Sequence, residues 1–329
     1  LAMFSIDPEI GQVPAGRLTF LESVAVGDGV QALTAVDSAP QIFGRATDGG
    51  DGQLFSLFYL DSDGNPAIDY DPLANLTAAD MELPAGVSDP LSGRGRIDVA
   101  ADGEHLVGVS DANDYLYLFR RDPVSGALAF QEGVGPDRPL RGARGVAFAP
   151  DGRHVLVAAA GDEVAGNPAL AIYSRRAPDT LFAFLERDVD GVDGVPRMRG
   201  PNEVAISPDG AHVYAVSLPD DSLLRFDRDP RLGLDDETAG QHLQFVEGWF
   251  DGVDGVSGLA EPRRILISPD GESLFVSSQR FDTIAVFSRD ADPESAGYGS
   301  LTFLQRIDND RDVGGIAGSQ GMAMDPEGR

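Results

Sequence analysis

The stretch Val204-Ala-Ile-Ser-Pro-Asp-Gly-Ala-His-Val-Tyr-Ala-Val-Ser217 joins a short apolar run to an alternating apolar and polar run through a Pro-Asp-Gly turn. A turn of this kind between two runs of β-forming residues is typical of a β-hairpin. The pattern recurs at intervals of 49 to 61 residues, which indicates repeats of one structural unit. The turn glycines are Gly103, Gly152, Gly210, Gly271 and Gly328.

Two further apolar runs follow each hairpin. In the unit quoted above they are Leu223-Leu-Arg-Phe-Asp-Arg-Asp229 and Leu243-Gln-Phe-Val-Glu247. Four strands per unit, repeated around an axis, predict an all-β fold of the β-propeller type, because radial repetition protects sheet edges that a lone four-stranded sheet leaves exposed. No part of the chain has the pattern of a long helix.

We expect one propeller domain over residues 1–329, with six four-stranded blades or alternatively seven. The segment Leu1-Ala-Met-Phe-Ser5 matches the third-strand segment Leu170-Ala-Ile-Tyr-Ser174, so we expect the two ends of the chain to share a blade. The predicted blades are residues 31–91, which lack the Asp-Gly turn, then 92–140, 141–198, 199–259, 260–316, and finally 317–329 together with 1–30.

The chain is strongly acidic, with 54 acidic against 25 basic residues and a formal net charge of -29. Nucleic acids and anionic membranes would be repelled and are not expected as partners. All basic residues are arginine, a bias that suits a halophilic or marine source; the alternative is a GC-rich genome and a solvated acidic surface. The absence of cysteine excludes disulfides and thiolate chemistry.

The location of the protein is predicted from the start of the chain. It opens on Leu1 rather than methionine, so we expect that a leader was removed and that the protein is extracellular or periplasmic. No apolar run approaches the roughly 20 residues that span a bilayer, so membrane insertion is not expected.

The loops predicted after the second and fourth strands are acidic and should emerge on one face of the propeller. Carboxylates separated by two or three residues, with intervening glycines, are suited to calcium, which binds six to eight oxygens. The alternative is that these are solvated Asp-Gly turns. The candidate ligands are Asp188, Asp190, Asp193, Asp251, Asp254, Asp308 and Asp310.

One residue per unit falls two positions before the innermost strand and should line the mouth of the central channel. Two of the six are arginines, whose guanidinium groups bind carboxylate or phosphate in a bidentate manner, so the ring is suited to a small anionic ligand. The alternative is that these residues only face channel water. They are Gln31, Gly95, Arg144, Asn202, Arg263 and Gln320.

Three of the four histidines, His105, His154 and His212, recur just after the turn and are therefore predicted to be structural. A catalytic residue has no reason to recur in three repeats. The sequence contains no nucleophile elbow, phosphate-binding loop or zinc-binding helix motif.

The unit that begins at Val204 and continues to Asp229 resembles the lactonase-like and YVTN-type β-propeller repeats of bacterial exported proteins. The resemblance extends over nearly the whole chain and rests on residues that build the fold. It implies a propeller of the kind found in 6-phosphogluconolactonase and in cycloisomerases of muconate-type lactones. Such enzymes use Arg, Glu and His side chains near the channel mouth, which makes Arg144, Arg263 and Glu203 the candidate catalytic residues.

Three functions are compatible with these observations. The first, which we take as the main hypothesis, is a non-catalytic exported platform whose acidic, calcium-binding face holds a small anionic ligand or a protein partner. The second is a lactonase-like hydrolase acting at the channel mouth. The third is one module of a large surface protein. Fold resemblance alone does not decide among them.

Overall fold

The computed structural model describes residues 93–122, 128–135, 140–161, 168–175, 182–229, 242–309, 311, 312, 316, 317, 322 and 324. It also describes the strand backbones at 2–7, 17–23, 30–35, 41–48, 51–60 and 66–69. The predicted site residues Gln320 and Asp310 lie outside the described residues, and so does the side chain of Gln31.

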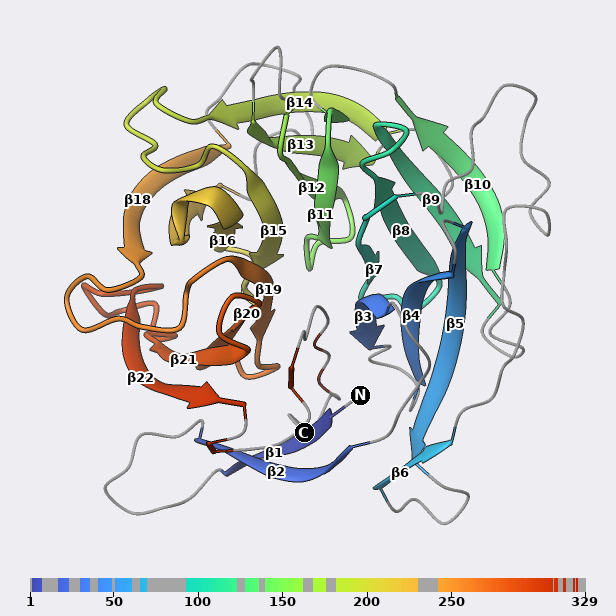
Figure 1. The fold of residues 1–329 in the computed structure, drawn as a ribbon. Coiled ribbons are helices and arrows are strands. Elements are labelled where there is room, and N and C mark those ends of the chain that lie inside the picture. Colours follow the sequence, from blue (N-terminus) through green and yellow to red (C-terminus); the bar gives the residue numbers. More distant parts are fainter. Residues whose placement is uncertain are drawn as a thin grey trace.

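Five four-stranded antiparallel sheets and one two-stranded sheet surround a common centre (Figure 1). We number the four-stranded sheets as blades 1 to 5. Blade 1 holds β3 (Val30–Ala35), β4 (Gln41–Asp48), β5 (Asp51–Leu60) and β6 (Pro66–Asp69). Blade 2 holds β7 (Ile97–Val99), β8 (His105–Ser110), β9 (Tyr115–Arg121) and β10 (Leu128–Val134). Blade 3 holds β11 (Ala143–Phe148), β12 (His154–Ala159), β13 (Ala169–Arg175) and β14 (Phe182–Val189).

Blades 4 and 5 are the remaining two four-stranded sheets. Blade 4 holds β15 (Pro201–Ile206), β16 (His212–Ser217), β17 (Ser222–Arg228) and β18 (Leu243–Phe250). Blade 5 holds β19 (Pro262–Ile267), β20 (Ser273–Ser278), β21 (Thr283–Arg289) and β22 (Leu301–Asp308). The two-stranded sheet pairs β1 (Ala2–Asp7) with β2 (Arg17–Ser23). The all-β propeller is therefore confirmed, while the division into six blades stays a prediction.

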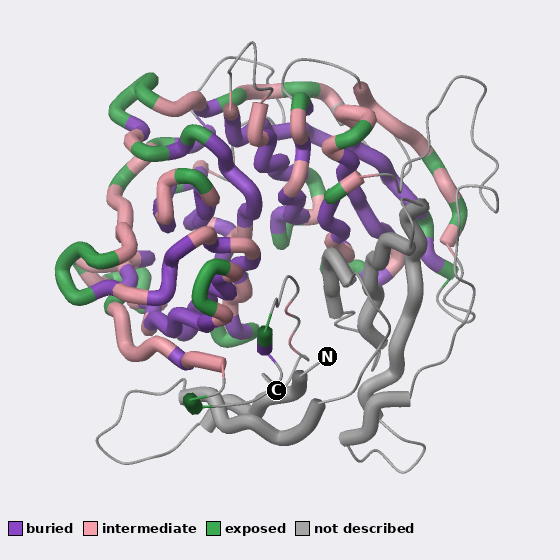
Figure 2. Tube along the Cα trace, in the orientation of Figure 1, coloured by how far each residue is buried: buried purple, intermediate pink, exposed green. Residues whose placement is uncertain are grey.

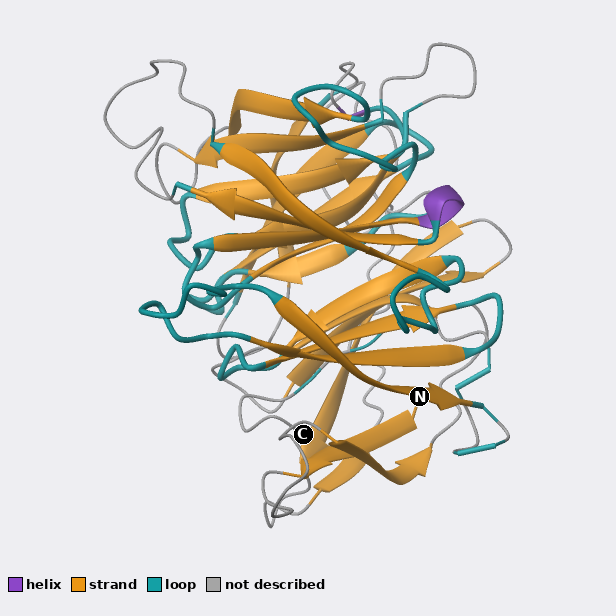
Figure 3. Ribbon diagram, turned by 90° about the vertical axis from the view of Figure 1, so that its left-hand side faces the viewer, coloured by secondary structure: helices purple, strands orange, loops and turns teal. Residues whose placement is uncertain are grey.

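Within each blade the strands follow one another from the centre of the ring to its rim, so β11, β15 and β19 lie innermost (Figure 1). The loops gather at the two faces of the ring, and the short 3-10 helix η3 (Leu218–Asp220) lies on one of them (Figure 3). Because every blade runs in the same direction, the starts of the inner strands and the loops after the second strands share a face. No helix among the described residues is long and apolar enough to cross a membrane.

The second strand of each of blades 2 to 5 is buried on both faces. The strands β8, β12, β16 and β20 are buried at every position, because neighbouring blades cover both sides of the sheet. Outer strands such as β18 mix buried, intermediate and exposed residues, and exposure is concentrated in the loops (Figure 2). The core thus consists of apolar layers between successive blades.

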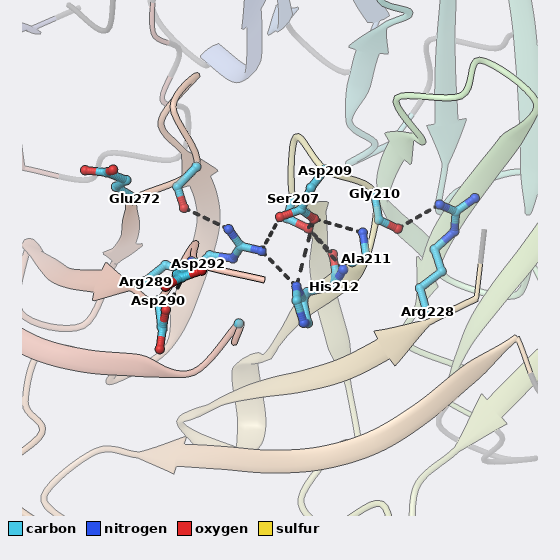
Figure 4. Close-up of polar contacts among 12 residues, drawn as sticks. Ser207, Asp209, Gly210, Ala211, His212, Arg228, Glu272, Arg289, Asp290 and Asp292 are labelled. Carbon is cyan, nitrogen blue, oxygen red and sulfur yellow. Dashed lines mark hydrogen bonds and ion pairs between the residues drawn. The ribbon is translucent and has the colours of Figure 1, made fainter. Parts of the chain in front are cut away.

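The recurrent arginine at the end of the third strand links neighbouring blades. Arg289 donates from Nη1 to the carbonyl of Gly271 in its own turn (3.0 Å). Its Nη2 donates to Asp209 in the turn of blade 4 (2.6 Å; Figure 4). Arg228 likewise bonds the carbonyl of Gly210 (2.9 Å) and Asp151 in blade 3 (2.6 Å). We call these arginines the blade clamps.

The recurrent histidines belong to the same contacts. His105 and His154 lie 2.7 and 2.9 Å from the aspartates of their own turns, and Arg289 Nη2 lies 2.8 Å from Nδ1 of His212. A guanidinium can only donate, so Nδ1 of His212 accepts this bond and the ring is neutral. The histidines are therefore structural, as their recurrence predicted.

The neutral ring of His212 predicts a loss of stability in acid. Burial lowers the pKa of His212 to about 4, and the charges of Arg289 and Arg225 act in the same direction. Because the pKa is below that of the unfolded chain, stability is complete above about pH 6.5 and falls as pH drops from there to about 4, by about 3 kcal/mol. We expect the melting temperature to fall over this range and the fall to be smaller in His212→Gln. An equal slope in both proteins would contradict the assignment.

Candidate functional site

The predicted mouth residues lie at a repeated β-bulge. In β3, β11, β15 and β19 the pairing with the next strand skips one residue, and the skipped residues are Gln31, Arg144, Asn202 and Arg263. These four residues therefore lie inside the innermost strands rather than before them, whereas Gly95 does precede β7. A bulge leaves the extra residue out of the ladder and redirects its side chain.

Arg144 and Arg263 come together with a third arginine that the sequence analysis missed. Burial lowers the pKa of the Arg263 guanidinium, and repulsion by Arg94 and Arg144 lowers it further, while Glu261 opposes the shift. Nε of Arg263 is buried and has no hydrogen-bond partner in the described part of the chain. We call Arg94, Arg144 and Arg263 the mouth arginines.

One aspartate anchors two of the mouth arginines. Asp111, in the loop after β8, accepts a bond from the backbone N–H of Arg94 (2.6 Å) through Oδ1. Its Oδ2 lies 3.3 Å from Nε of Arg144. Asp111 thus holds the side chain of Arg144 and the backbone of Arg94 on the same face of the propeller.

Glu203, the third catalytic candidate, is sealed in a buried ion triad. Its Oε2 lies 3.1 Å from Nε of Arg96 in blade 2 and 2.8 Å from Nη1 of Arg264 in blade 5, and the Glu203 side chain is only 1% exposed. Gly145 holds the equivalent place in blade 3, where a β-carbon would come within 2.6 Å of the Glu203 backbone. Blade 3 therefore contributes no side chain, and Arg96 reaches Glu203 from two blades away.

The triad supports the backbone of the mouth. Arg96 Nη2 and Asn202 Nδ2 both donate to the carbonyl of Arg263, each at 3.0 Å. Asn202 is thus a support for Arg263 at the mouth. The repeat alignment contained a signal for the triad, because Arg96, Glu203 and Arg264 each directly follow a mouth position.

Among the described residues of the mouth that are named above, arginines outnumber carboxylates, although the whole chain carries a formal charge of -29. Three carboxylates, those of Asp111, Glu203 and Glu261, accompany five arginines, which are Arg94, Arg96, Arg144, Arg263 and Arg264. Such a concentration of guanidinium groups attracts an anion and offers bidentate hydrogen bonds to carboxylate or phosphate.

The candidate calcium ligands have other contacts. In two equivalent loops, Asp190 and Asp251 accept backbone N–H bonds from Met198 (2.7 Å) and Leu259 (2.9 Å), so each ties its loop together. Asp193 and Asp254 are turn residues with left-handed backbones, both at φ 50°. Asp308 is paired with Arg306.

Asp188 differs from the other candidates because it is buried. Burial raises its pKa to about 7, and the charges of Glu186 and Asp193 add to the effect. Among the described residues no group of three His, Asp or Glu side chains is placed to hold a metal ion. Calcium binding by the acidic loops stays a prediction.

Calcium binding has a direct test. A bound ion stabilises the native state by mass action, by about 2.7 kcal/mol at a hundredfold excess over Kd. If the acidic loops bind calcium, a chelator lowers the melting temperature and added calcium restores it. An unchanged melting temperature would contradict the prediction. The variant Asp193→Asn removes one candidate ligand and leaves the hydrogen bonds of Asp190 and Asp251 intact. A smaller effect of calcium on its melting temperature would place the ion near Asp193.

Residues 182–306, from β14 into β22, match the family model described as Lactonase, 7-bladed beta-propeller. The resemblance to lactonase-like propellers is thereby confirmed. The model names seven blades and our sequence analysis favoured six, so the number of blades stays a prediction. No curated protein matches the sequence.

Solved structures share the fold at low sequence identity. A candidate 6-phosphogluconolactonase from Bacteroides uniformis has a TM-score of 0.55 at 18% identity, with 94% of this chain and 82% of that chain covered. The periplasmic gluconolactonase of Pseudomonas aeruginosa has a TM-score of 0.55 at 21% identity, with 95% and 77% covered. A structure of a nidogen/laminin complex has a TM-score of 0.54 at 10% identity, with 98% and 97% covered. These likenesses concern the fold alone.

Proposed function

We propose that this protein is a lactonase-type hydrolase that opens the ring of an anionic lactone at the channel mouth. The observation that carries the proposal is the convergence of Arg94, Arg144 and Arg263, with a buried Arg263 Nε that has no hydrogen-bond partner among the residues that the structure describes. Its support from similarity is the match to a lactonase family model. These findings favour the hydrolase over the non-catalytic platform.

The mouth arginines suit two tasks in lactone hydrolysis. Attack on the lactone carbonyl places negative charge on the carbonyl oxygen, and a fixed guanidinium stabilises that charge where water is scarce. A second guanidinium binds a carboxylate or phosphate on the sugar and so orients the ring. We assign the first task to Arg263, whose Nε is buried, and the second to Arg144 and Arg94.

Glu203 has no acid or base role in this proposal. Its carboxylate is held by two guanidiniums and is shielded from solvent. We assign it the support of the mouth through Arg96 and Arg264. Export to the periplasm or cell exterior stays a prediction from the sequence.

The test compares lactones with and without a negative group. We expect the protein to open 6-phosphogluconolactone or a carboxylated sugar lactone faster than neutral glucono-δ-lactone. Arg263→Ala should lower kcat/KM by about 10²–10³-fold, and Arg144→Ala should act mainly through KM. The control is Arg120→Ala, an exposed arginine 3.7 Å from Glu104. No turnover of any of these lactones by the unaltered protein would overturn the proposal.

A further inference from the structure

Glu261 occupies a position that glycine holds in three other blades. The position lies two residues before each mouth residue, and its occupants in blades 2, 3 and 4 are Gly93, Gly142 and Gly200. A β-carbon at any of the three would come within 3.0 Å of the loop that follows the second strand. Blade 5 alone among these four places a charged side chain there.

The backbone of Glu261 is strained. Its φ is 53°, in the left-handed region that Gly93 and Gly142 also occupy. Of the seven described non-glycine residues with positive φ, five are aspartates, which tolerate this region well. The other two are Glu261 and Arg197, and the Arg197 guanidinium stacks on Phe250 at 4.3 Å. Strain that persists at one residue of a repeated position points to a function.

The surroundings of Glu261 place it at the mouth. Glu261 lies two residues before Arg263 in the chain, and its negative charge opposes the fall in the pKa of Arg263. Its backbone is fixed on both sides, because its N–H donates to Asp221 Oδ1 (2.8 Å) and its carbonyl accepts from the Gln279 N–H (3.1 Å). Within the described residues the carboxylate itself makes no hydrogen bond or ion pair. A fixed backbone with an uncommitted carboxylate suits a group that acts on a ligand.

From this geometry we infer that Glu261 is the general base of lactone opening, an inference that rests on the proposed function. The Glu261 carboxylate takes a proton from water while the water oxygen bonds to the lactone carbonyl carbon, and the carbonyl oxygen becomes an oxyanion that Arg263 stabilises. When the carbonyl re-forms, the bond to the ring oxygen breaks, and the ring oxygen takes the proton back from Glu261. Water is consumed and a hydroxy acid is produced.

The test uses two variants, of which one keeps the backbone strain at position 261 and the other relieves it. Glu261→Gln keeps the shape and removes the base, whereas Glu261→Gly restores the residue of the other blades and relieves the strain. We expect both to lower kcat by about 10²–10⁴-fold, with a melting temperature for Glu261→Gly no lower than that of the unaltered protein. The acidic limb of the kcat profile against pH should disappear in Glu261→Gln.

A matched control separates catalysis from backbone relief. Asp282, also left-handed at φ 52°, lies in the loop between β20 and β21 of the same blade, and Asp282→Gly should leave kcat unchanged. Full activity in Glu261→Gly would overturn the role of Glu261 while leaving the lactonase proposal intact. Loss of activity in Arg263→Ala but not in Glu261→Gln would do the same. Absence of turnover in the unaltered protein would overturn both.

Discussion

Replacing Glu203 with alanine is expected to lower the free energy of unfolding by about 3–5 kcal/mol. The variant removes the carboxylate that both Arg96 and Arg264 contact, and both of these side chains are only 8% exposed. A buried ion that loses its partner keeps its desolvation cost and loses the attraction that offset it. Urea unfolding of both proteins measures this difference in unfolding free energy, provided that the dependence of the free energy on urea concentration has the same slope in both.

Two comparisons test the cause of this loss. Glu247→Ala removes a carboxylate from Arg225, but Glu247 is 36% exposed, so we expect a loss below about 1 kcal/mol. Replacing all three triad residues with methionine removes the two buried guanidiniums together with the carboxylate and should cost less than Glu203→Ala alone. If the triple variant were the less stable of the two, the charge argument would be wrong and packing would be the cause.

The repeat made the fold predictable, because Pro-Asp-Gly turns and apolar runs are local signals. The same alignment located Arg144 and Arg263, since a residue at a fixed place in every unit reaches the same place around the axis. It missed Arg94, because blade 2 has Gly95 at the mouth position and the arginine lies one residue earlier. A residue that occurs in one repeat only has no counterpart in the other repeats, so an alignment of the repeats does not reveal it.

Contacts between repeats explain why other roles were missed. The sequence made Glu203 a catalytic candidate, but its partners belong to blades 2 and 5 and no local pattern pairs them. The acidic loops pose a different difficulty. A carboxylate that caps a backbone N–H, as Asp190 does, has the same spacing in the sequence as one that binds an ion.

Replacing Arg289 with methionine is expected to cost about 3–5 kcal/mol of unfolding free energy and to loosen blade 5 from blade 4. The Arg289 side chain is 1% exposed and donates to Asp209, to the carbonyl of Gly271 and, from Nε, to the Tyr214 hydroxyl at 2.9 Å. Methionine fills similar space but donates nothing, so these acceptors lose their partner inside the protein. Arg225→Met is the matched control, since its partners Asp227 and Glu247 are 50% and 36% exposed, and it should cost less.

The pH dependence of the stability of Arg289→Met tests whether Arg289 acts as a blade clamp through the charge of Asp209. Burial raises the pKa of Asp209, but hydrogen bonds from Ser207, the Ala211 N–H and Arg289 outweigh it and bring the pKa to about 2. A depressed carboxyl pKa gives stability that is present above the unfolded value, near 4, and is lost as pH falls toward 2. Without Arg289 the folded pKa moves back toward the unfolded value, so this part of the acid loss should shrink. An unchanged acid limb between pH 4 and 2 would mean that Arg289 does not hold the Asp209 charge, and that packing alone joins blades 4 and 5.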